Sequence, residues 1–273
     1  MKHYETVYRA LDLPRTALDV ALGTIPLPFA DASAPYSLYG FPPALIPIYS
    51  DNSGPGYRGF WRHPLVPRAT TLVELSVEAG YRADEVARNL EQLFSYMSIT
   101  SICVLNGITP ETESFATGVG LPDLAAISRL ATEIGDSLPD LRGRPPFDRD
   151  CPLACFDDPS DYDGDFPNVA MVERGGDLRN CCALEVDREL QQRIAARPDA
   201  PPWFTSRDQA ATCRALLDAG DLAGAWMSLN SPGWRFADAK LALRALADAA
   251  HDAELSVIAE AWTAEQHEHA GGY

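Results

Sequence analysis

The sequence is poor in basic residues. It has 22 Lys and Arg against 39 Asp and Glu, which gives a formal net charge of −17. Nucleic-acid binding depends on Lys and Arg contacts to phosphates, so this balance argues against direct nucleic-acid binding, and it also disfavours anionic membrane surfaces. An acidic surface suits a basic protein partner through electrostatic steering, although the same charge also serves solubility.

The sequence also lacks long apolar runs. No window of about 18 or more apolar residues is present, which excludes a typical membrane-spanning helix. The segment from Met1 to Glu5 leads into charged residues and does not resemble an apolar leader flanked by Lys or Arg. Six cysteines in 273 residues are too few for a disulfide scaffold. We therefore expect a cytoplasmic protein that does not bind a membrane.

The common catalytic and nucleotide-binding motifs are missing. Neither G-x-G-x-x-G nor G-x-x-x-x-G-K-[ST] occurs, so a nucleotide-binding loop is unsupported. The nucleophile elbow G-x-S-x-G is missing as well. We expect no catalytic residue, no cofactor and no bound metal, and the sequence favours a binding role over an enzymatic one.

The clearest structural signals lie between residues 42 and 99. Apolar runs over Ala44–Tyr49 and Tyr57–Trp61 flank a turn-rich segment, Ser50–Gly56, which predicts a β-hairpin. Thr70–Val77 is rich in β-branched residues and predicts a third strand. An amphipathic helix is expected to begin near Ala83, with its apolar stripe formed by Val86, Leu90, Leu93, Phe94 and Met97.

The rest of the chain is mostly helical in pattern. We predict an α+β fold in which a small N-terminal antiparallel sheet, backed by helices, precedes a mostly α-helical C-terminal part. The predicted division is an α+β domain over residues 1–138, an acidic linker or loop rich in Pro and Asp over 139–182, and a helical domain over 183–273. Short helices with short connections favour antiparallel packing in the last part.

Four cysteines raise the hypothesis of a zinc site. Cys151 and Cys155 have a spacing just within the range used by structural zinc sites, and Cys181 and Cys182 follow. The second pair is adjacent, which makes ligation of one metal by both residues awkward. Buried or free thiols are the alternative that we favour.

The acidic loop contains seven Asp and one Arg between residues 148 and 165. The run Asp161, Asp163 and Asp165 resembles the beginning of a calcium loop, but the sixth and twelfth positions hold Phe166 and Val172 in place of Gly and Glu. The calcium pattern therefore fails. A solvated loop and a docking surface for a cationic partner both remain open.

A hydrolase is the alternative function. His63 lies beside two aromatic residues and has the chemistry of a general base. Asp51 and Glu74 offer carboxylates at the same sheet. This reading requires the three side chains to meet in one cleft, whereas turn and sheet-edge roles are their ordinary explanation.

The central stretch is similar to SMI1/KNR4-like (SUKH-like) bacterial immunity proteins. The resemblance rests on the segment Ile46-Pro47-Ile48-Tyr49-Ser50-Asp51-Asn52-Ser53-Gly54, an apolar strand that runs into an Asp/Gly turn. The aromatic strand Tyr57–Trp61 and the amphipathic helix over Val86–Phe94 add to it. The Asn-Gly-Gly segment usual in that family is replaced here by Tyr39-Gly40-Phe41-Pro42. The resemblance implies a non-enzymatic protein that binds and blocks a bacterial toxin.

The leading hypothesis is thus an acidic immunity or adaptor protein that binds a basic toxin domain. Its contacts are expected at the turn after the first central strand, at the aromatic strand and along the acidic loop. The predicted partner-binding residues are Asp51, Asn52, Trp61, Asp157, Asp158, Asp161, Asp163 and Asp165.

Overall fold

The computed structural model describes residues 2–29, 32–35, 39–51, 55–265 and 271–273. It contains a five-stranded antiparallel sheet in the order β1-β2-β3-β4-β5, each strand pairing with the next in sequence. The α+β class predicted above is confirmed, with the sheet in the N-terminal half and most helices after it. The strands are β1 (Ala32–Ser33), β2 (Leu45–Asp51), β3 (Gly56–Trp61), β4 (Thr71–Ser76) and β5 (Arg82–Ala87).

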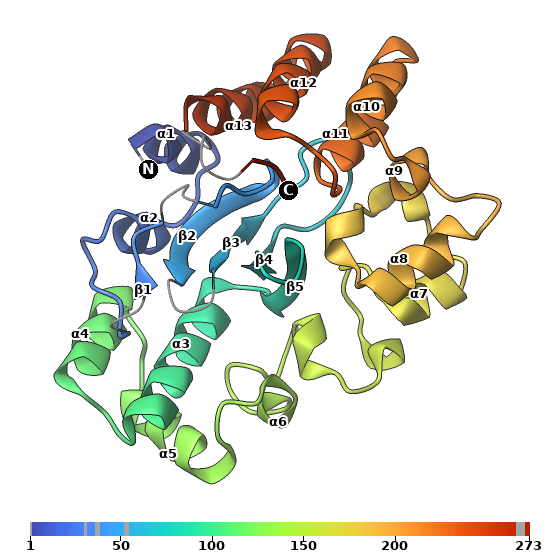
Figure 1. Ribbon diagram of the computed structural model, residues 1–273. Helices are drawn as coiled ribbons and strands as arrows, with labels where there is room; N and C mark the ends of the chain where they lie inside the picture. The colour runs from blue at the N-terminus through green and yellow to red at the C-terminus, as the bar shows by residue number, and fades with distance from the viewer. Residues whose placement is uncertain (1, 30–31, 36–38, 52–54, 266–270) are drawn as a thin grey trace.

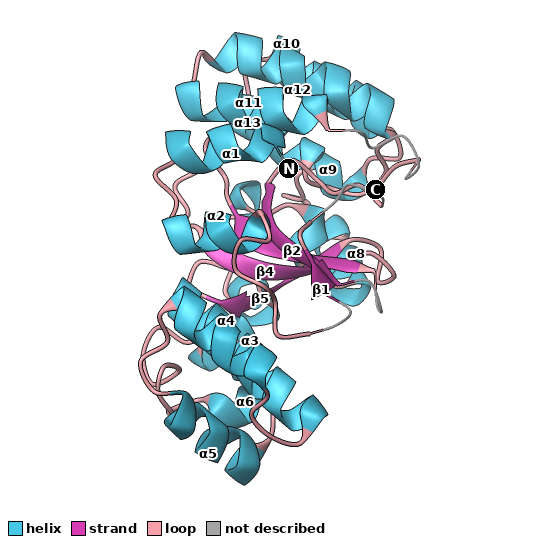
Figure 2. Cartoon of the chain, turned by 90° about the vertical axis from the view of Figure 1, so that its left-hand side faces the viewer, coloured by secondary structure: helices cyan, strands magenta, loops and turns pink. Residues whose placement is uncertain are grey.

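Helices lie on two sides of the sheet. Figure 2 shows α1 and the C-terminal helices above the sheet and α3 to α6 below it. The α-helices before the acidic loop are α1 (Lys2–Ala10), α2 (Arg15–Ala21), α3 (Leu90–Leu105), α4 (Pro110–Val119), α5 (Leu124–Ile134) and α6 (Leu138–Leu141). Those after it are α7 (Val169–Glu173), α8 (Arg188–Ala195), α9 (Pro202–Thr205), α10 (Gln209–Asp218), α11 (Leu222–Leu229), α12 (Phe236–Ala250) and α13 (Ala253–Ala264).

The predicted hairpin is present. β2 and β3 pair in antiparallel register from Leu45 opposite Trp61 to Asp51 opposite Gly56. The third predicted strand, Thr70–Val77, corresponds to β4. Gly59 lies in β3 where the chain passes very close to β2, since a Cβ added there would be 2.3 Å from the carbonyl oxygen of Ile46. A residue without a side chain is therefore required at this point of the hairpin.

The helix expected to begin near Ala83 was placed too early. Arg82–Ala87 forms β5, in which Glu85 pairs with Val73 of β4. The helix α3 begins at Leu90, where the side chain of Asn89 accepts a hydrogen bond from the backbone N–H of Gln92 at 3.0 Å. Pairing with β4 determines the conformation of this segment, and the apolar stripe that suggested one helix spans a strand and a helix.

The largest group of buried residues draws on both halves of the chain, from Tyr4 to Tyr273. Trp262 of α13 donates a hydrogen bond from its indole to the carbonyl oxygen of Phe41 at 2.8 Å. Asn230, after α11, accepts a hydrogen bond from the backbone N–H of Ala44 at 2.8 Å. The C-terminal helices therefore pack on the approach to β2, while the division into three segments remains a prediction.

Candidate functional site

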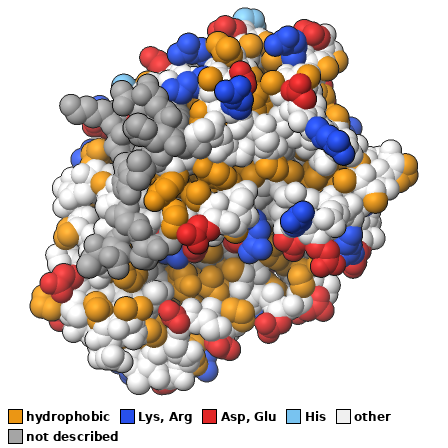
Figure 3. All heavy atoms as spheres, in the orientation of Figure 1, with side chains coloured by type: hydrophobic (Ala, Val, Ile, Leu, Met, Phe, Trp, Pro, Cys, Tyr) orange, Lys and Arg blue, Asp and Glu red, His pale blue; other side chains and the backbone are white. Residues whose placement is uncertain are grey.

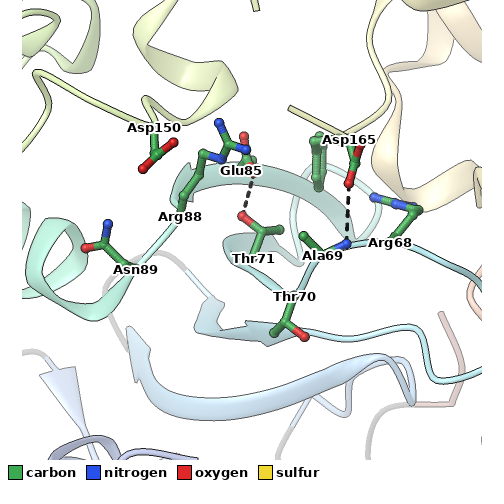
Figure 4. Close-up of a pocket in the computed structure, with 10 residues that line it drawn as sticks. Arg68, Ala69, Thr70, Thr71, Glu85, Arg88, Asn89, Asp150 and Asp165 are labelled. Carbon is green, nitrogen blue, oxygen red and sulfur yellow. Dashed lines mark hydrogen bonds between the residues drawn. The ribbon is translucent and has the colours of Figure 1, made fainter. Parts of the chain in front are cut away.

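A cavity of about 270 Å³ lies where β4, β5, the start of α3 and the acidic loop meet. Figure 4 shows Asp150 on one side of this cavity and Asp165 and Arg68 on the other, with Arg88 and Glu85 between them. Most of the residues that line it are polar, and they include both signs of charge. Its residues are Arg68, Ala69, Thr70, Thr71, Glu85, Arg88, Asn89, Asp150, Asp165 and Phe166.

Glu85 anchors the acidic loop to the sheet. Its residue is 3% exposed, and Oε2 accepts hydrogen bonds from the Tyr162 hydroxyl at 2.6 Å and from the Leu153 backbone N–H at 2.7 Å. Oε1 accepts a third from the Thr71 hydroxyl at 2.5 Å, the contact drawn in Figure 4. Burial raises the pKa of Glu85, and these hydrogen bonds oppose the shift by favouring the carboxylate.

Arg88 and Asn89 lie between β5 and α3. The Arg88 guanidinium pairs with Asp163 at 3.0 Å and lies 5.8 Å from the centre of the Tyr162 ring. Asp163 is 74% exposed, so solvent screens this ion pair strongly. Arg88 therefore keeps a cationic group at the cavity without being committed to a buried partner.

Arg68 is fixed by hydrogen bonds to residues that do not line the cavity. Its side chain is 5% exposed, and Nη1 donates hydrogen bonds to Glu185 Oε1 at 2.6 Å and to the Asn180 carbonyl oxygen at 2.9 Å. The Phe166 ring lies 5.8 Å from the guanidinium carbon. Nε is buried and finds no hydrogen-bond partner in the part of the chain that the structure describes. Buried donors are nearly always paired, so this nitrogen is an exception that needs an explanation.

Behind Arg68 lies a buried polar cluster around Glu185. Oε1 of Glu185 also accepts hydrogen bonds from the indole of Trp61 at 2.8 Å and from His63 Nε2 at 3.0 Å. His63 Nδ1 in turn accepts one from the indole of Trp226 at 2.9 Å. Because an indole N–H only donates, His63 must carry its proton on Nε2. Oε2 of Glu185 accepts from the backbone N–H of Cys182 at 2.8 Å.

The ionisation of this cluster follows from its contacts. Burial opposes ionisation of Glu185, but the charge of Arg68 and the hydrogen bonds from His63 and Trp61 outweigh burial and lower its pKa to about 2. Burial lowers the pKa of His63, and the Arg68 charge acts in the same direction. The cluster therefore consists of a carboxylate, a guanidinium and a neutral imidazole at neutral pH.

Metal-ligating atoms come together at one place in the described residues. His63, Cys182 and Glu185 each offer an atom within 4.8 Å of the others, and all three residues are buried. Both His63 nitrogens are already hydrogen-bonded, and burial raises the pKa of the Cys182 thiol well above its usual value. Arg68 supplies the positive charge beside Glu185, so this cluster suits a structural role better than metal binding.

The structure does not assemble the zinc site considered from the sequence. Of the four cysteines Cys151, Cys155, Cys181 and Cys182, only Cys182 belongs to a metal-capable group among the described residues. The Cys151 thiol donates a hydrogen bond to the Phe147 carbonyl oxygen at 2.8 Å. None of the six cysteines, all of them among the described residues, forms a disulfide.

The five predicted partner-binding residues of the acidic loop are exposed. Two of them pair with arginines: Asp161 with Arg142 at 3.4 Å and Asp163 with Arg88 at 3.0 Å. Two others accept from backbone N–H groups, Asp165 from Ala69 at 3.4 Å and Asp158 from Ser160 at 2.8 Å. The fifth residue, Asp157, is exposed like the other four.

The remaining three predicted residues differ in their placement. Asp51 ends β2 and is half-buried, and Asn52 lies outside the described residues. Trp61 is 1% exposed and hydrogen-bonded to Glu185. Its side chain is part of the core, so the expectation that Trp61 contacts a partner is corrected: aromatic residues on β3 face the interior because helices cover the sheet on both sides.

The hydrolase alternative required Asp51, His63 and Glu74 in one cleft. The structure gives them different neighbours. His63 is bonded to Glu185 and Trp226, whereas Glu74 pairs with Arg58 at 2.6 Å in the middle of the β3–β4 ladder. None of the three lines the cavity beside Glu85.

Sequence reasoning missed Arg68, Glu85 and Arg88 as members of one site. Glu85 was assigned to a helix, and only its pairing with β4 places it at the cavity. Arg68 lies in the proline-containing connection before β4, where no local pattern distinguishes it from a surface arginine. Assigning Arg82–Ala87 to a strand was the one step that could have placed Glu85 at this site from the sequence.

No family model, no curated protein and no solved structure matches this chain. Within the residues that the structure describes, no helix combines the length and the apolar character needed to cross a bilayer.

Proposed function

We propose that this chain is a binding protein of the immunity or adaptor kind, which docks a basic protein such as a toxin domain on its acidic loop. The observation that carries the proposal is the exposure of the Asp side chains in residues 148–165. All seven Asp side chains of this loop are exposed: Asp148, Asp150, Asp157, Asp158, Asp161, Asp163 and Asp165.

The loop is fixed to the sheet beneath it. Tyr162 and Leu153 hydrogen-bond to the buried carboxylate of Glu85, and Cys155, Tyr162 and Phe166 are buried. Figure 3 shows acidic side chains of this face gathered mainly toward its lower right edge, over the segment drawn in yellow-green in Figure 1. A charged surface that is already ordered loses little conformational entropy on binding, and it raises the rate of association with a partner of opposite charge.

The resemblance of residues 46–61 to SUKH-like immunity proteins supports the same proposal. A cytoplasmic location belongs to it as well, because six free thiols suit a reducing compartment. The hydrolase alternative is less favoured, because its three candidate residues bind different neighbours.

The test compares two variants of equal charge change. Asp148→Lys with Asp157→Lys alters the loop, whereas Asp218→Lys with Asp248→Lys alters two exposed residues on α10 and α12. Association with a partner isolated from the native host is measured by stopped-flow at several salt concentrations. We expect the loop variant to associate at least about tenfold more slowly and with a weaker salt dependence, and the control to stay within about twofold of the wild type. Equal rates for the two variants would remove the loop as the docking surface.

A further inference from the structure

The cavity beside Glu85 combines two kinds of charge in one small space. Arg68 and Arg88 provide guanidinium donors, and Asp150 and Asp165 provide carboxylates. Neither arginine forms an ion pair within 4.0 Å with either of these two aspartates, since Arg68 pairs with Glu185 and Arg88 with Asp163. The lining groups of opposite sign therefore face the cavity without neutralising one another.

Arg68 gives the most specific indication of a ligand. Its side chain is 95% buried at the wall of the cavity, and both hydrogen bonds of the guanidinium leave from Nη1, so Nη2 has no partner among the described residues and, unlike Nε, is not fully buried. An arginine with one end fixed and an unpaired donor next to a cavity is pre-organised for a carboxylate.

The carboxylates exclude a simple anion as the best match. Glu85 already accepts three hydrogen bonds and needs nothing further, but the side-chain carboxylate of Asp150 forms no hydrogen bond or ion pair in the described structure; only its backbone carbonyl oxygen is bonded, to Gln92 Nε2 at 3.2 Å. Figure 4 shows Asp150 and Asp165 on opposite sides of the space. A lone anion would meet these two charges, and a lone cation would meet the two arginines.

We propose that this cavity binds a small zwitterion of the α-amino-acid class, with its carboxylate toward Arg68 and its ammonium group toward Asp150, which face each other across the space in Figure 4. The volume of about 270 Å³ lies just below the range usual for drug-sized ligands, so a free amino acid fits and a nucleotide does not. The threonine residues at positions 70 and 71 add to a lining that is polar apart from Phe166 and Ala69.

The experiment uses the full chain without any partner protein, so its outcome does not depend on the proposed docking function. The free L-amino acids are tested one at a time for an increase in melting temperature, and the best is titrated by calorimetry. Acetate and methylamine serve as the separated charges. We expect one amino acid to bind with one site per chain and at least about tenfold more tightly than either half. Absence of binding by every amino acid, or equal binding by acetate, would overturn the proposal.

A matched pair of variants locates the site. Asp150→Asn removes the carboxylate but keeps a residue that tolerates the left-handed backbone found here, φ 48°. Asp148→Asn makes the same change two residues earlier, at an exposed position outside the cavity. We expect Asp150→Asn to weaken amino-acid binding about tenfold or more without changing the melting temperature of the free protein, and Asp148→Asn to leave both unchanged. Equal affinities in the two variants would place the ligand elsewhere and contradict the assignment.

Discussion

Arg68 and Glu185 form an ion pair at 2.6 Å whose side chains are 5% and 0% exposed. They are separated by 117 residues in sequence and join the connection before β4 to the segment before α8. Compared with apolar packing in its place, a buried pair of this kind adds little to the free energy of unfolding. Removing one partner alone lowers that free energy strongly, because the remaining charge stays buried without a counter-ion.

We expect Glu185→Gln to lower the free energy of unfolding by about 3–5 kcal/mol, since it leaves Arg68 charged and uncompensated. The measurement is urea unfolding followed by tryptophan fluorescence. The control is Asp177→Asn, which breaks an ion pair with Arg179 whose side chains are 43% and 82% exposed, and which should cost less than about 1 kcal/mol. Comparable losses in the two variants would mean that the buried pair contributes no more than a surface pair.

Stability should depend on the ionisation of Glu185 in acid. Its pKa is lowered from the ordinary value of 4.5 to about 2 in the folded state, so the unfolded chain takes up this proton first. The contribution of Glu185 is therefore present above pH 4.5 and is lost as pH falls from 4.5 toward 2. We expect unfolding free energies measured across this range to decline more steeply in the wild type than in Glu185→Gln. Parallel curves would contradict the lowered pKa.

His63 should make the protein less stable just below neutral pH. Burial lowers its pKa below the ordinary value of 6.5, so the unfolded chain binds the proton more readily than the folded one. The stabilising contribution is present above pH 6.5 and is lost as pH falls below it. His63→Gln should remove this part of the pH dependence, and His251→Asn, at an exposed helix end, should retain it. A wild-type free energy of unfolding that stays constant from neutral pH down to the pH range in which the carboxylates titrate would refute the prediction.

Glu85 should control the order of the acidic loop. Glu85→Ala removes the acceptor of three hydrogen bonds and leaves the buried Tyr162 hydroxyl and Leu153 N–H unpaired, at an expected cost of about 2–4 kcal/mol. Limited proteolysis and hydrogen exchange should both show faster opening of residues 148–165. Tyr162→Phe deletes one of these bonds and should cost about 1 kcal/mol. Unchanged protection of the loop in Glu85→Ala would show that packing alone holds it.

The close approach at Gly59 gives a test of the hairpin. Gly59→Ala would place a Cβ 2.3 Å from the Ile46 carbonyl oxygen and 2.8 Å from Pro47 Cα, both backbone atoms. We therefore expect this change to lower the free energy of unfolding by about 1–3 kcal/mol or more. Gly118→Ala is the comparison, because the three atoms nearest to the added methyl group all belong to the side chain of Ile25 and not to the backbone. A thermal melt that ranks Gly118→Ala as the more damaging change would contradict this account of the β2–β3 contact.

Local sequence signals were sufficient for the parts of the fold that depend on short-range chemistry. The apolar runs and the turn between Tyr49 and Tyr57 predicted the central hairpin, and β-branched residues predicted β4. The strand β5 was missed because Asp84, Glu85 and the alanines beside them have weak strand propensity, and Val86 continues the apolar spacing of α3. Its conformation comes from pairing with β4, which a local pattern does not contain.

The candidate site was harder to predict from the sequence for the same reason. The His63–Glu185 contact joins residues 122 positions apart, and Arg68 meets Glu85 in one cavity only after the sheet has formed. The acidic loop was visible in the composition, but its anchoring through Tyr162 to Glu85 was not. Trp61 was expected at a surface because the sequence does not state that both sides of the sheet are covered by helices.

The contact between α1 and α13 has a consequence for how the protein is made. These helices pack side by side, as Figures 1 and 2 show, although about 250 residues separate them. During synthesis α1 leaves the ribosome about 250 residues before α13, so this part of its apolar side stays uncovered over that interval. Until α13 emerges, Tyr4, Val7 and Tyr8 lack part of their final environment, and the nascent chain is open to capture by a chaperone at this point.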